Sequence, residues 1–282
     1  RSIVSLLSRD QFVAVLGASG VGLGQRRAGE IHWLGSVGFI DEGYTAWSVA
    51  LETLDRLLGE YARPRSEVTV LVSGHFSRYC LVPWSEEISS PNELLGFAQL
   101  CFEDLYGAAN QPWNIVLSAE AAGHDRIASA LPQELLERLR SLVNARNLRL
   151  SSVQPYLMAA YNRFDKSLGN GDFLFVVAEP VRSVLLLARE GRWVAVRSVG
   201  SNDSDAALSA LIGRERQLQA STSERPLNVY LHAPARLPND FCGDVHLRLS
   251  FYKKLATAKS IEQIDALLEE LVDRFGKLPP QA

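Results

Sequence analysis

Val68-Thr69-Val70-Leu71-Val72-Ser73-Gly74-His75 is the stretch from which the fold of this chain can be worked out. Its first five residues form a continuous run of β-branched and aliphatic side chains, which is typical of a strand buried on both faces. Ser73-Gly74-His75 interrupts the run, and the apolar residues 76–82 resume it. The sequence therefore predicts two consecutive strands with a short break between them.

A helix is predicted directly after these strands. Pro83-Trp84-Ser85 ends the second strand, and Ser90, Pro91 and Glu93 form the pattern of a capping box with proline at the first helical position. The helix should end at 106–107. The side chains expected to be buried on it are Leu94, Leu95, Phe97, Ala98, Cys101, Phe102 and Leu105. The result is a predicted core β-β-α unit that contains no recognisable catalytic grouping.

Composition narrows the class of protein. A chain of 282 residues has room for two or three folding units, and a net charge of -3 gives no general reason to bind nucleic acid. No apolar run reaches the roughly 20 residues that span a bilayer. Cys80, Cys101 and Cys242 lie far apart without CxxC spacing, so we expect reduced thiols, a cytoplasmic location without a signal peptide and no metal site.

The N-terminal region contains a glycine-rich stretch. Phe12 to Leu16 is predicted as a strand, and glycines follow at 17, 20, 22 and 24. Glycine lets backbone N–H groups approach an anion, so one hypothesis is a nucleotide-binding loop. Its candidate residues are Gly17, Ser19, Gly20 and Gly22. The stretch runs into Gln25-Arg26 instead of the Lys-Ser/Thr of a phosphate loop, and a glycine-bearing hairpin from 12–16 to 29–34 is the alternative.

The remaining pattern alternates between helices and strands. Helices are predicted at 44–61, 131–143, 155–164 and 206–219, and strands at 113–118, 127–130, 148–153, 173–178, 183–189, 193–198 and 228–232. Glu190-Gly191 is expected to be a tight hairpin turn. Residues 221–227 are polar and short, which is typical of a linker. This alternation predicts an α/β fold.

Three stretches carry a resemblance to a known family: Leu71–Tyr79, Leu81–Trp84 and Ser151–Pro155. Together with the order of elements over about residues 10–220, they resemble the actin-like (ribonuclease H-related) ATPase fold. More narrowly, they resemble the cytoplasmic actin-like proteins of type IV pilus, mannose-sensitive pilus and type II secretion assembly. The resemblance implies mixed sheets with flanking helices.

Active members of that fold carry an Asp-x-Gly-type turn after the first strand. Here the position reads Leu16-Gly17-Ala18-Ser19-Gly20, without an acidic residue to hold magnesium. The resemblance therefore implies a non-catalytic scaffold that needs no cofactor. An actin-like ATPase that uses ATP and magnesium is kept as an alternative.

His75, Arg78 and Trp84 are the candidate partner-binding residues of this part. His75 lies beside Ser73 and Ser77, but no third residue completes a catalytic arrangement, so a histidine in a turn is the other interpretation. Arg78 is flanked by aromatic residues and could bind a partner or an anion, or could simply pack over a ring.

The tail carries a second resemblance. Leu231–Pro234, Leu237–Asp240, Asp244–Ala256 and Leu271–Pro280 resemble the C-terminal domain of bacterial transcription-repair coupling factor. This resemblance implies an interaction module for nucleotide-excision repair proteins. The candidate contact residues are Arg248, Tyr252, Lys253 and Lys254. No helicase motif accompanies the tail, so the DNA translocation of that family is not implied. Direct binding to nucleic acid is not expected, because acidic residues of the next predicted helix offset the basic ones.

Three segments are thus predicted. Residues 1–220 form a degenerate actin-like domain, 221–227 a linker, and 228–282 a small α+β segment like part of the coupling factor. The expected function is a non-catalytic cytoplasmic scaffold whose partners are proteins of a pilus or secretion assembly. A DNA-repair interaction fragment is the alternative.

Overall fold

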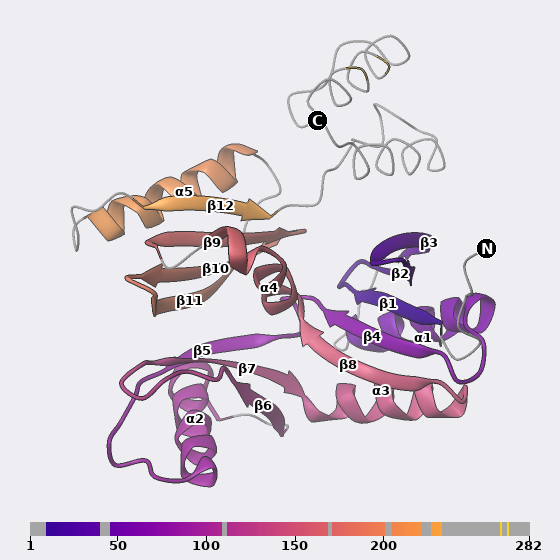
Figure 1. Ribbon diagram of the computed structural model, residues 1–282, viewed down its shortest axis with the longest axis horizontal. Helices are drawn as coiled ribbons and strands as arrows, with labels where there is room; N and C mark the ends of the chain where they lie inside the picture. The colour runs from indigo at the N-terminus through magenta and orange to yellow at the C-terminus, as the bar shows by residue number, and fades with distance from the viewer. Residues whose placement is uncertain are drawn as a thin grey trace.

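The computed structural model describes residues 10–39, 46–108, 112–168, 171–200, 205–220 and 227–232, together with Ala266 and Glu270. Over these residues the chain forms three sheets with helices packed on their faces (Figure 1). The predicted mixed α/β class is confirmed.

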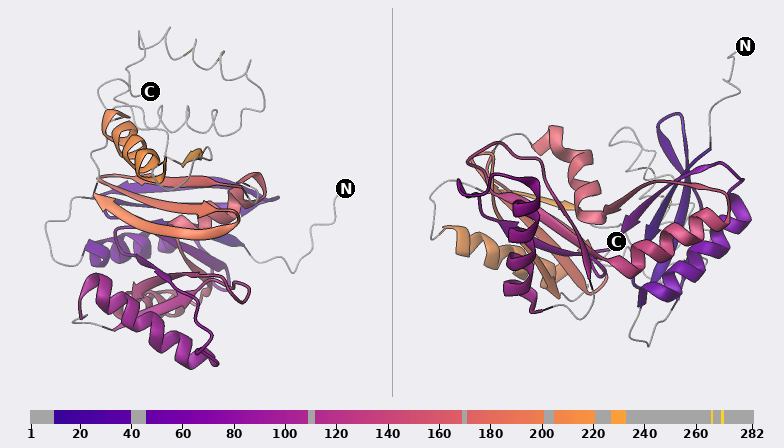
Figure 2. Two further views of the ribbon diagram at one scale, coloured as in Figure 1. Left: turned by 90° about the vertical axis from the view of Figure 1, so that its left-hand side faces the viewer. Right: turned by 90° about the horizontal axis from the view of Figure 1, so that it is seen from below.

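The largest sheet has five strands and holds the N-terminal half of the described chain. Its members, in spatial order, are β3 (Glu30–Gly38), β2 (Gly20–Arg27), β1 (Gln11–Leu16), β4 (Glu67–Val72) and β8 (Arg149–Pro155). The strands β3, β2 and β1 are antiparallel, whereas β1, β4 and β8 run parallel. The helices α1 (Ala46–Tyr61) and α3 (Gln133–Ala145) lie side by side against this sheet and bury their leucines in one core (Figure 2).

The second sheet has four strands and is covered by a helix on each face. Its order is β11 (Arg192–Gly200), β10 (Arg182–Arg189), β9 (Phe173–Glu179) and β12 (Asn228–His232). One face packs on α4 (Tyr156–Leu168) and the other on α5 (Asp205–Ala220). Glu190 and Gly191 join β10 to β11 with φ of 50° and 71°, which confirms the predicted tight turn.

The third sheet is small, and it joins the other two. It consists of β5 (Arg78–Val82), β7 (Arg126–Pro132) and β6 (Trp113–Leu117), with α2 (Pro91–Tyr106) on one face. Strand β7 contributes to three of the four cores of the described chain. Ile127 packs with the four-stranded sheet, Ala128 and Ala130 pack with α2, and Leu131 packs with the five-stranded sheet. Each strand alternates its side chains between two faces, so one strand can serve several cores.

The predicted core β-β-α unit is divided between two sheets. Strand β4 lies inside the five-stranded sheet, whereas β5 and α2 build the small one. Val68, Val70 and Val72 are fully buried, but Thr69 and Leu71 on the other face are only partly buried. The expectation of a strand buried on both faces is therefore met on one face only.

The predicted capping box of α2 is confirmed, but its predicted buried set is wrong in part. Ser90 Oγ accepts a hydrogen bond from Glu93 N at 3.3 Å, and Glu93 Oε2 accepts one from Ser90 N at 3.2 Å. Only Ala98 and Phe102 are buried, while Leu95 is 38% and Leu105 is 58% exposed. A three-stranded sheet is too narrow to cover a wider strip of the helix.

The expectations for the glycine stretch need correction. It is not a loop beyond residue 19, because residues 20–27 form β2, which pairs with β1 in a hairpin. The predicted hairpin from 12–16 to 29–34 is also wrong, because β3 pairs with β2 and not with β1.

The predicted boundary at 227/228 lies just before the last strand of the four-stranded sheet. Asn228–His232 forms β12, which is hydrogen-bonded in parallel to β9. The division of the chain into three segments stays a prediction.

Candidate binding cleft

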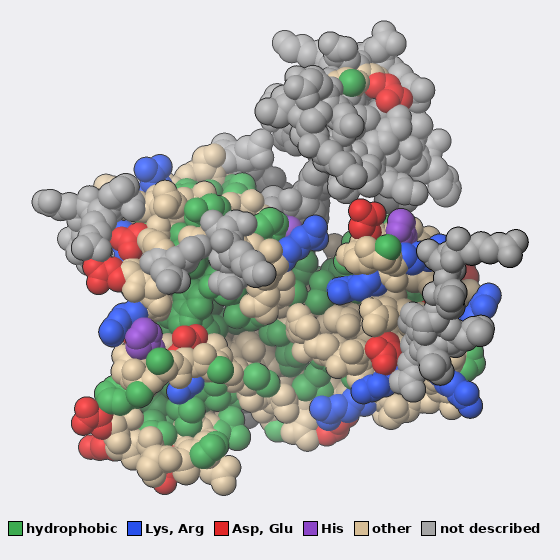
Figure 3. Space-filling model, viewed as in Figure 1, with side chains coloured by type: hydrophobic (Ala, Val, Ile, Leu, Met, Phe, Trp, Pro, Cys, Tyr) green, Lys and Arg blue, Asp and Glu red, His purple; other side chains and the backbone are tan. Residues whose placement is uncertain are grey.

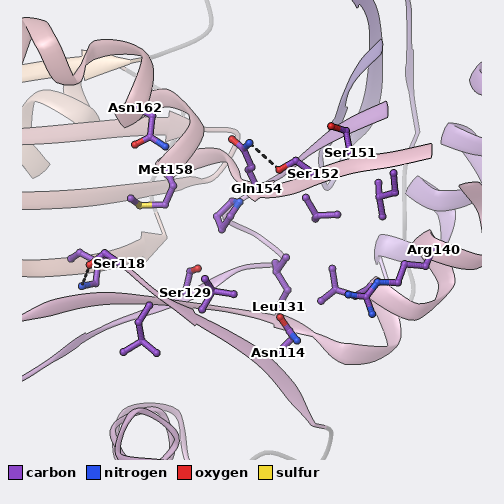
Figure 4. A pocket seen from close by; sticks show the side chains of 17 residues that line it. Asn114, Ser118, Ser129, Leu131, Arg140, Ser151, Ser152, Gln154, Met158 and Asn162 are labelled. Atoms are coloured by element: carbon purple, nitrogen blue, oxygen red, sulfur yellow. Dashed lines mark hydrogen bonds between the residues drawn. The ribbon is translucent and has the colours of Figure 1, made fainter. Parts of the chain in front are cut away.

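A cleft of about 490 Å³ lies where the small sheet meets the edge of the five-stranded sheet (Figure 4). Strands β6, β7 and β8 line it, together with one side of α3 and of α4. Its volume is in the range of sites that hold small molecules. The side chains and backbone of these five elements decide what it can bind.

The floor of the cleft is one face of the small sheet. Asn114 and Val116 of β6 lie beside Leu131 and Ser129 of β7, and the register pairs them across the strands. The intervening residues, such as Ala128, face α2 instead. This alternation leaves Val116 60% exposed, although it is an aliphatic residue in a strand. The floor is therefore an open surface of apolar and neutral polar side chains.

The opposite wall is the open edge of β8. Sheet order places β8 at an edge, with β4 as its one strand partner in the described chain. All six residues from 150 to 155 line the cleft, although successive side chains of a strand point to opposite faces. Lining by consecutive residues means that the backbone edge itself borders the space. A register shift opposite Val68 and Thr69 bulges the strand at this point.

The two helices close the ends of the cleft. Leu136 and Arg140 lie one turn apart on α3, and Met158 and Asn162 one turn apart on α4. Figure 4 shows Arg140 at one end and Asn162 at the other, with Ser118 near the Asn162 end. Gln154 Nε2 donates to Ser152 Oγ at 3.0 Å inside the cleft.

The described lining of the cleft is neutral apart from Arg140. Among the described residues that line the cleft, none is Asp, Glu, His, Cys or Lys, so no acid, base or strong nucleophile faces it. The described part of the chain also holds no group of three or more His, Cys, Asp or Glu residues arranged for a metal ion. No described helix is both long and apolar enough to cross a membrane.

The four predicted nucleotide-binding residues occupy the β1–β2 hairpin. Gly17 N donates to Gly20 O at 3.0 Å, and Ser19 O accepts from Phe39 N at 3.0 Å. Gly20 and Gly22 lie within β2, where the indole of Trp33 covers Gly22. The structure thus gives these residues pairing and packing roles in the sheet, and nucleotide binding by them stays a prediction.

His75 lies at a junction between the five-stranded and four-stranded sheets. His75 Nε2 is 2.7 Å from Pro180 O, and Gly74 N donates to Glu179 Oε1 at 2.7 Å. Ser73 Oγ also bonds to the Glu179 carboxylate and accepts from His75 N at 3.1 Å. The polar groups of this turn are therefore bonded to the end of β9, which supports the interpretation of His75 as a histidine in a turn.

Arg78 begins β5 close to His75, whereas Trp84 lies beyond the other end of that strand. The Arg78 guanidinium lies 5.9 Å from the ring centre of Tyr106 and 5.8 Å from that of Trp113. These rings, and not its chain neighbours Phe76 and Tyr79, flank it. Burial and the nearby positive charge of Arg182 lower the pKa of Arg78.

The predicted partner-binding residues therefore do not form one site. Trp84 is 39% exposed, and its backbone N–H donates to Asp125 Oδ1 at 2.9 Å. None of His75, Arg78 and Trp84 lines the cleft. The predicted tail residues Arg248, Tyr252, Lys253 and Lys254 lie outside the described residues.

Sequence reasoning missed the cleft, because its residues are neutral and come from five separate elements. One signal was present: Asn114, Val116 and Ser118 alternate a polar and an aliphatic side chain on the face of β6 that does not pack against a helix. That face could have been recognised as uncovered only if the position of the neighbouring sheet were known.

Comparison with solved structures confirms the actin-like fold. A Bacteroides thetaiotaomicron protein with actin-like ATPase fold and unknown function matches 95% of this chain and 99% of its own, with a TM-score of 0.55 and 12% identity. The PilM–PilN type IV pilus biogenesis complex matches over 95% and 98%, with a TM-score of 0.54 and 15% identity. The cytoplasmic domain of EpsL, an inner membrane component of the type II secretion system of Vibrio cholerae, matches over 92% and 98%, with a TM-score of 0.51 and 12% identity.

Comparison of sequences confirms the second resemblance. Residues 231–282 match the family model of the TRCF domain. The transcription-repair-coupling factor of Haemophilus influenzae is 50% identical over 76 residues, which are 27% of this chain and 6% of that protein. That of Escherichia coli is 47% identical over 70 residues, which are 25% of this chain and 6% of that protein. The chain therefore spans only about 6% of the length of these relatives, and it combines an actin-like fold with a TRCF domain.

Proposed function

We propose that this chain is a non-catalytic scaffold that binds an extended segment of a partner protein in the cleft between the small sheet and β8. The observation that carries the proposal is the composition of the cleft: about 490 Å³ beside an open strand edge, with no acid among its described lining residues and no base to activate its serine hydroxyls. An exposed strand edge can accept another strand through main-chain hydrogen bonds, while neighbouring pockets select side chains.

The junction between the two large sheets supports a non-catalytic role. In that junction the Glu179 carboxylate accepts from Gly74 N and from the Ser73 hydroxyl. A negatively charged group therefore already occupies these donors, and a nucleotide phosphate brought to them would be repelled by it. The hairpin at 17–20 also lacks an acidic side chain for magnesium.

The setting that we propose is a pilus or secretion assembly on its cytoplasmic side. Support comes from two neighbours in fold, one solved as the PilM–PilN type IV pilus biogenesis complex and one a cytoplasmic domain of a secretion component. Both have low identity to this chain, at 15% and 12%, so the class of partner rests on the fold and on the cleft together.

Thermal melting with and without magnesium-ATP tests the non-catalytic part. A ligand that binds only the folded state raises the melting temperature by mass action. We expect no shift with magnesium-ATP. A shift of several degrees together with ATP turnover would contradict the scaffold and favour the actin-like ATPase.

A second candidate function rests on the tail, whose match to the coupling factor reaches 50% identity. We propose it as a module that contacts a nucleotide-excision repair protein through Arg248, Tyr252, Lys253 and Lys254. Titration of the full chain with a purified excision-repair protein of the same bacterium tests it. A Lys253→Glu/Lys254→Glu variant should weaken the binding, and equal binding by variant and native chain would remove these lysines from the contact.

A further inference from the structure

We propose that the cleft selects partner segments carrying an acidic side chain at one end, which pairs with Arg140. This inference rests on the proposed function, because it assumes that the cleft binds an extended segment. It adds the charge of the partner and the position of that charge along the segment.

Arg140 is the one charged residue among the described residues that line the cleft. It forms no hydrogen bond or ion pair with another described residue. Two other arginines, one on α3 and one directly after it, are engaged. Arg138 pairs with Glu134 at 2.7 Å and lies over the ring of Trp47, and Arg146 pairs with Asp55. Arg140 is thus the exposed cation of this helix that remains open to a partner carboxylate.

The charge lies at one end of an otherwise neutral cleft. Figure 4 shows Arg140 extending from α3 at one end, whereas Met158, Asn162 and Ser118 lie at the other. Between them, Figure 4 shows the apolar Leu131 together with the neutral polar Ser129 and Gln154. A segment laid along the cleft would therefore meet uncharged side chains in its middle and a cation only at one end. An acidic residue is favoured at that end, and uncharged residues elsewhere.

The edge of β8 sets the length of the segment. Six consecutive residues of β8 border the cleft, and a strand rises about 3.3 Å per residue. The bound segment is thus about six residues long, and every second side chain of the segment faces the floor of the cleft. Nucleic acid fits poorly, because phosphate backbones require several cations and the lining offers one.

Selection from a displayed library of random octapeptides on the immobilised full chain tests the inference. Four forms of the chain are compared: native, Arg140→Glu, Arg56→Glu, and a Val116→Trp/Asn162→Trp variant that fills the cleft. Val116 and Asn162 are exposed, so the larger side chains occupy the cleft and not the core. Arg56 is an exposed arginine of α1 that does not line the cleft. Thermal melting of each variant checks that it folds.

We expect the native chain and Arg56→Glu to select otherwise uncharged peptides with Asp or Glu at one terminal position. Arg140→Glu should lose that preference or replace it with Lys or Arg, and the filled variant should select none. In a titration with the native-selected peptide, Arg140→Glu should weaken binding about tenfold. Replacing the peptide's acid by Gln should weaken it about two- to fivefold, an effect that falls with added salt.

Two outcomes would overturn the inference, and they are distinguishable. Peptides that depend on the open cleft but show no acidic preference would refute the role of Arg140 and leave the proposed function standing. If no selected peptide depends on the cleft, the proposed function fails, and this inference fails with it.

Discussion

The backbone N–H of Gly74 donates a hydrogen bond of 2.7 Å to Glu179 Oε1 across 105 residues of chain. This contact connects the turn after β4 to the end of β9, and so connects the two large sheets. A Cβ atom at position 74 would lie 2.8 Å from the same oxygen, so the close approach requires glycine. The junction therefore depends on both residues: Gly74 leaves space beside its backbone N–H, and Glu179 supplies the carboxylate that accepts from it.

Glu179→Ala should lower the free energy of unfolding by about 2–3 kcal/mol, because it leaves Gly74 N and Ser73 Oγ without their charged acceptor. Glu179→Gln keeps part of the bonding, so about 1 kcal/mol is expected. Urea unfolding measures both. Glu52→Ala, at an exposed position of α1, should stay within about 0.5 kcal/mol. Equal effects of Glu179→Ala and Glu52→Ala would mean that the junction contributes nothing.

The stability of the chain should fall as the pH drops below the unfolded pKa of His232, which is about 6.5. Burial, and then the positive charge of Arg163, lowers the pKa of His232, whose Nε2 is 3.0 Å from the Tyr156 hydroxyl. With a folded pKa below the unfolded one, the unfolded chain takes up the proton first. This contribution to stability is therefore complete above the unfolded pKa and is lost as pH falls through it toward the folded one.

Melting temperatures at several pH values measure this effect. His232→Gln should give a shallower dependence between pH 7 and 5 than the native chain. His32→Gln, at an exposed position of β3, is the control for loss of a histidine and should keep the native slope. If His232→Gln leaves the slope unchanged, the acid sensitivity has another source.

Asp55 and Arg146 should contribute a coupling energy of about 0.5–1 kcal/mol in a double-mutant cycle. Arg146 Nε and Nη2 lie 2.5 and 2.8 Å from the Asp55 carboxylate, joining α1 to the end of α3. The side chain of Arg146 is 32% exposed and that of Asp55 is 45% exposed. Solvent therefore screens the pair, and added salt should reduce the coupling energy.

The pH dependence of this pair has a different cause from that of His232. Folding stabilises the charged form of Asp55, whereas it destabilises the charged form of His232. The hydrogen bond from Arg146 lowers the pKa of Asp55 below its ordinary value. The contribution is therefore present above the unfolded pKa of about 3.9 and is lost as pH falls through the folded pKa. A coupling that persists in acid well below that range would contradict this account.

Ser90→Ala should destabilise α2 by about 1 kcal/mol, whereas Ser90→Gly should cost only a few tenths. The serine hydroxyl accepts from Glu93 N, and truncation to alanine removes this bond. Hydrogen exchange of the first turn of α2 measures the effect. Equal protection in the two variants would show that the cap contributes little to this helix.

Much of the local structure could be predicted from the sequence. The cap Ser90-Pro91-x-Glu93 and the turn Glu190-Gly191 were predicted from their own residues, because the partners of these motifs lie within a few positions. The alternation of helices and strands gave the mixed α/β class for the same reason. The predictions that were wrong concern residues whose environment depends on distant parts of the chain. Leu95 and Leu105 stay uncovered, and the glycines of residues 20–24 belong to β2, where Trp33 packs on Gly22.

For the described residues, the sequence by itself determined the helices and strands other than β2. Its resemblances indicated an actin-like fold followed by a TRCF domain. Only the tertiary structure decided that β4 and β5 belong to different sheets, and that the edge of β8 and the floor of β6 and β7 enclose a cleft. Local signals follow from short-range backbone geometry and side-chain periodicity. A cleft depends on surfaces that stay uncovered after packing, and no single segment encodes that.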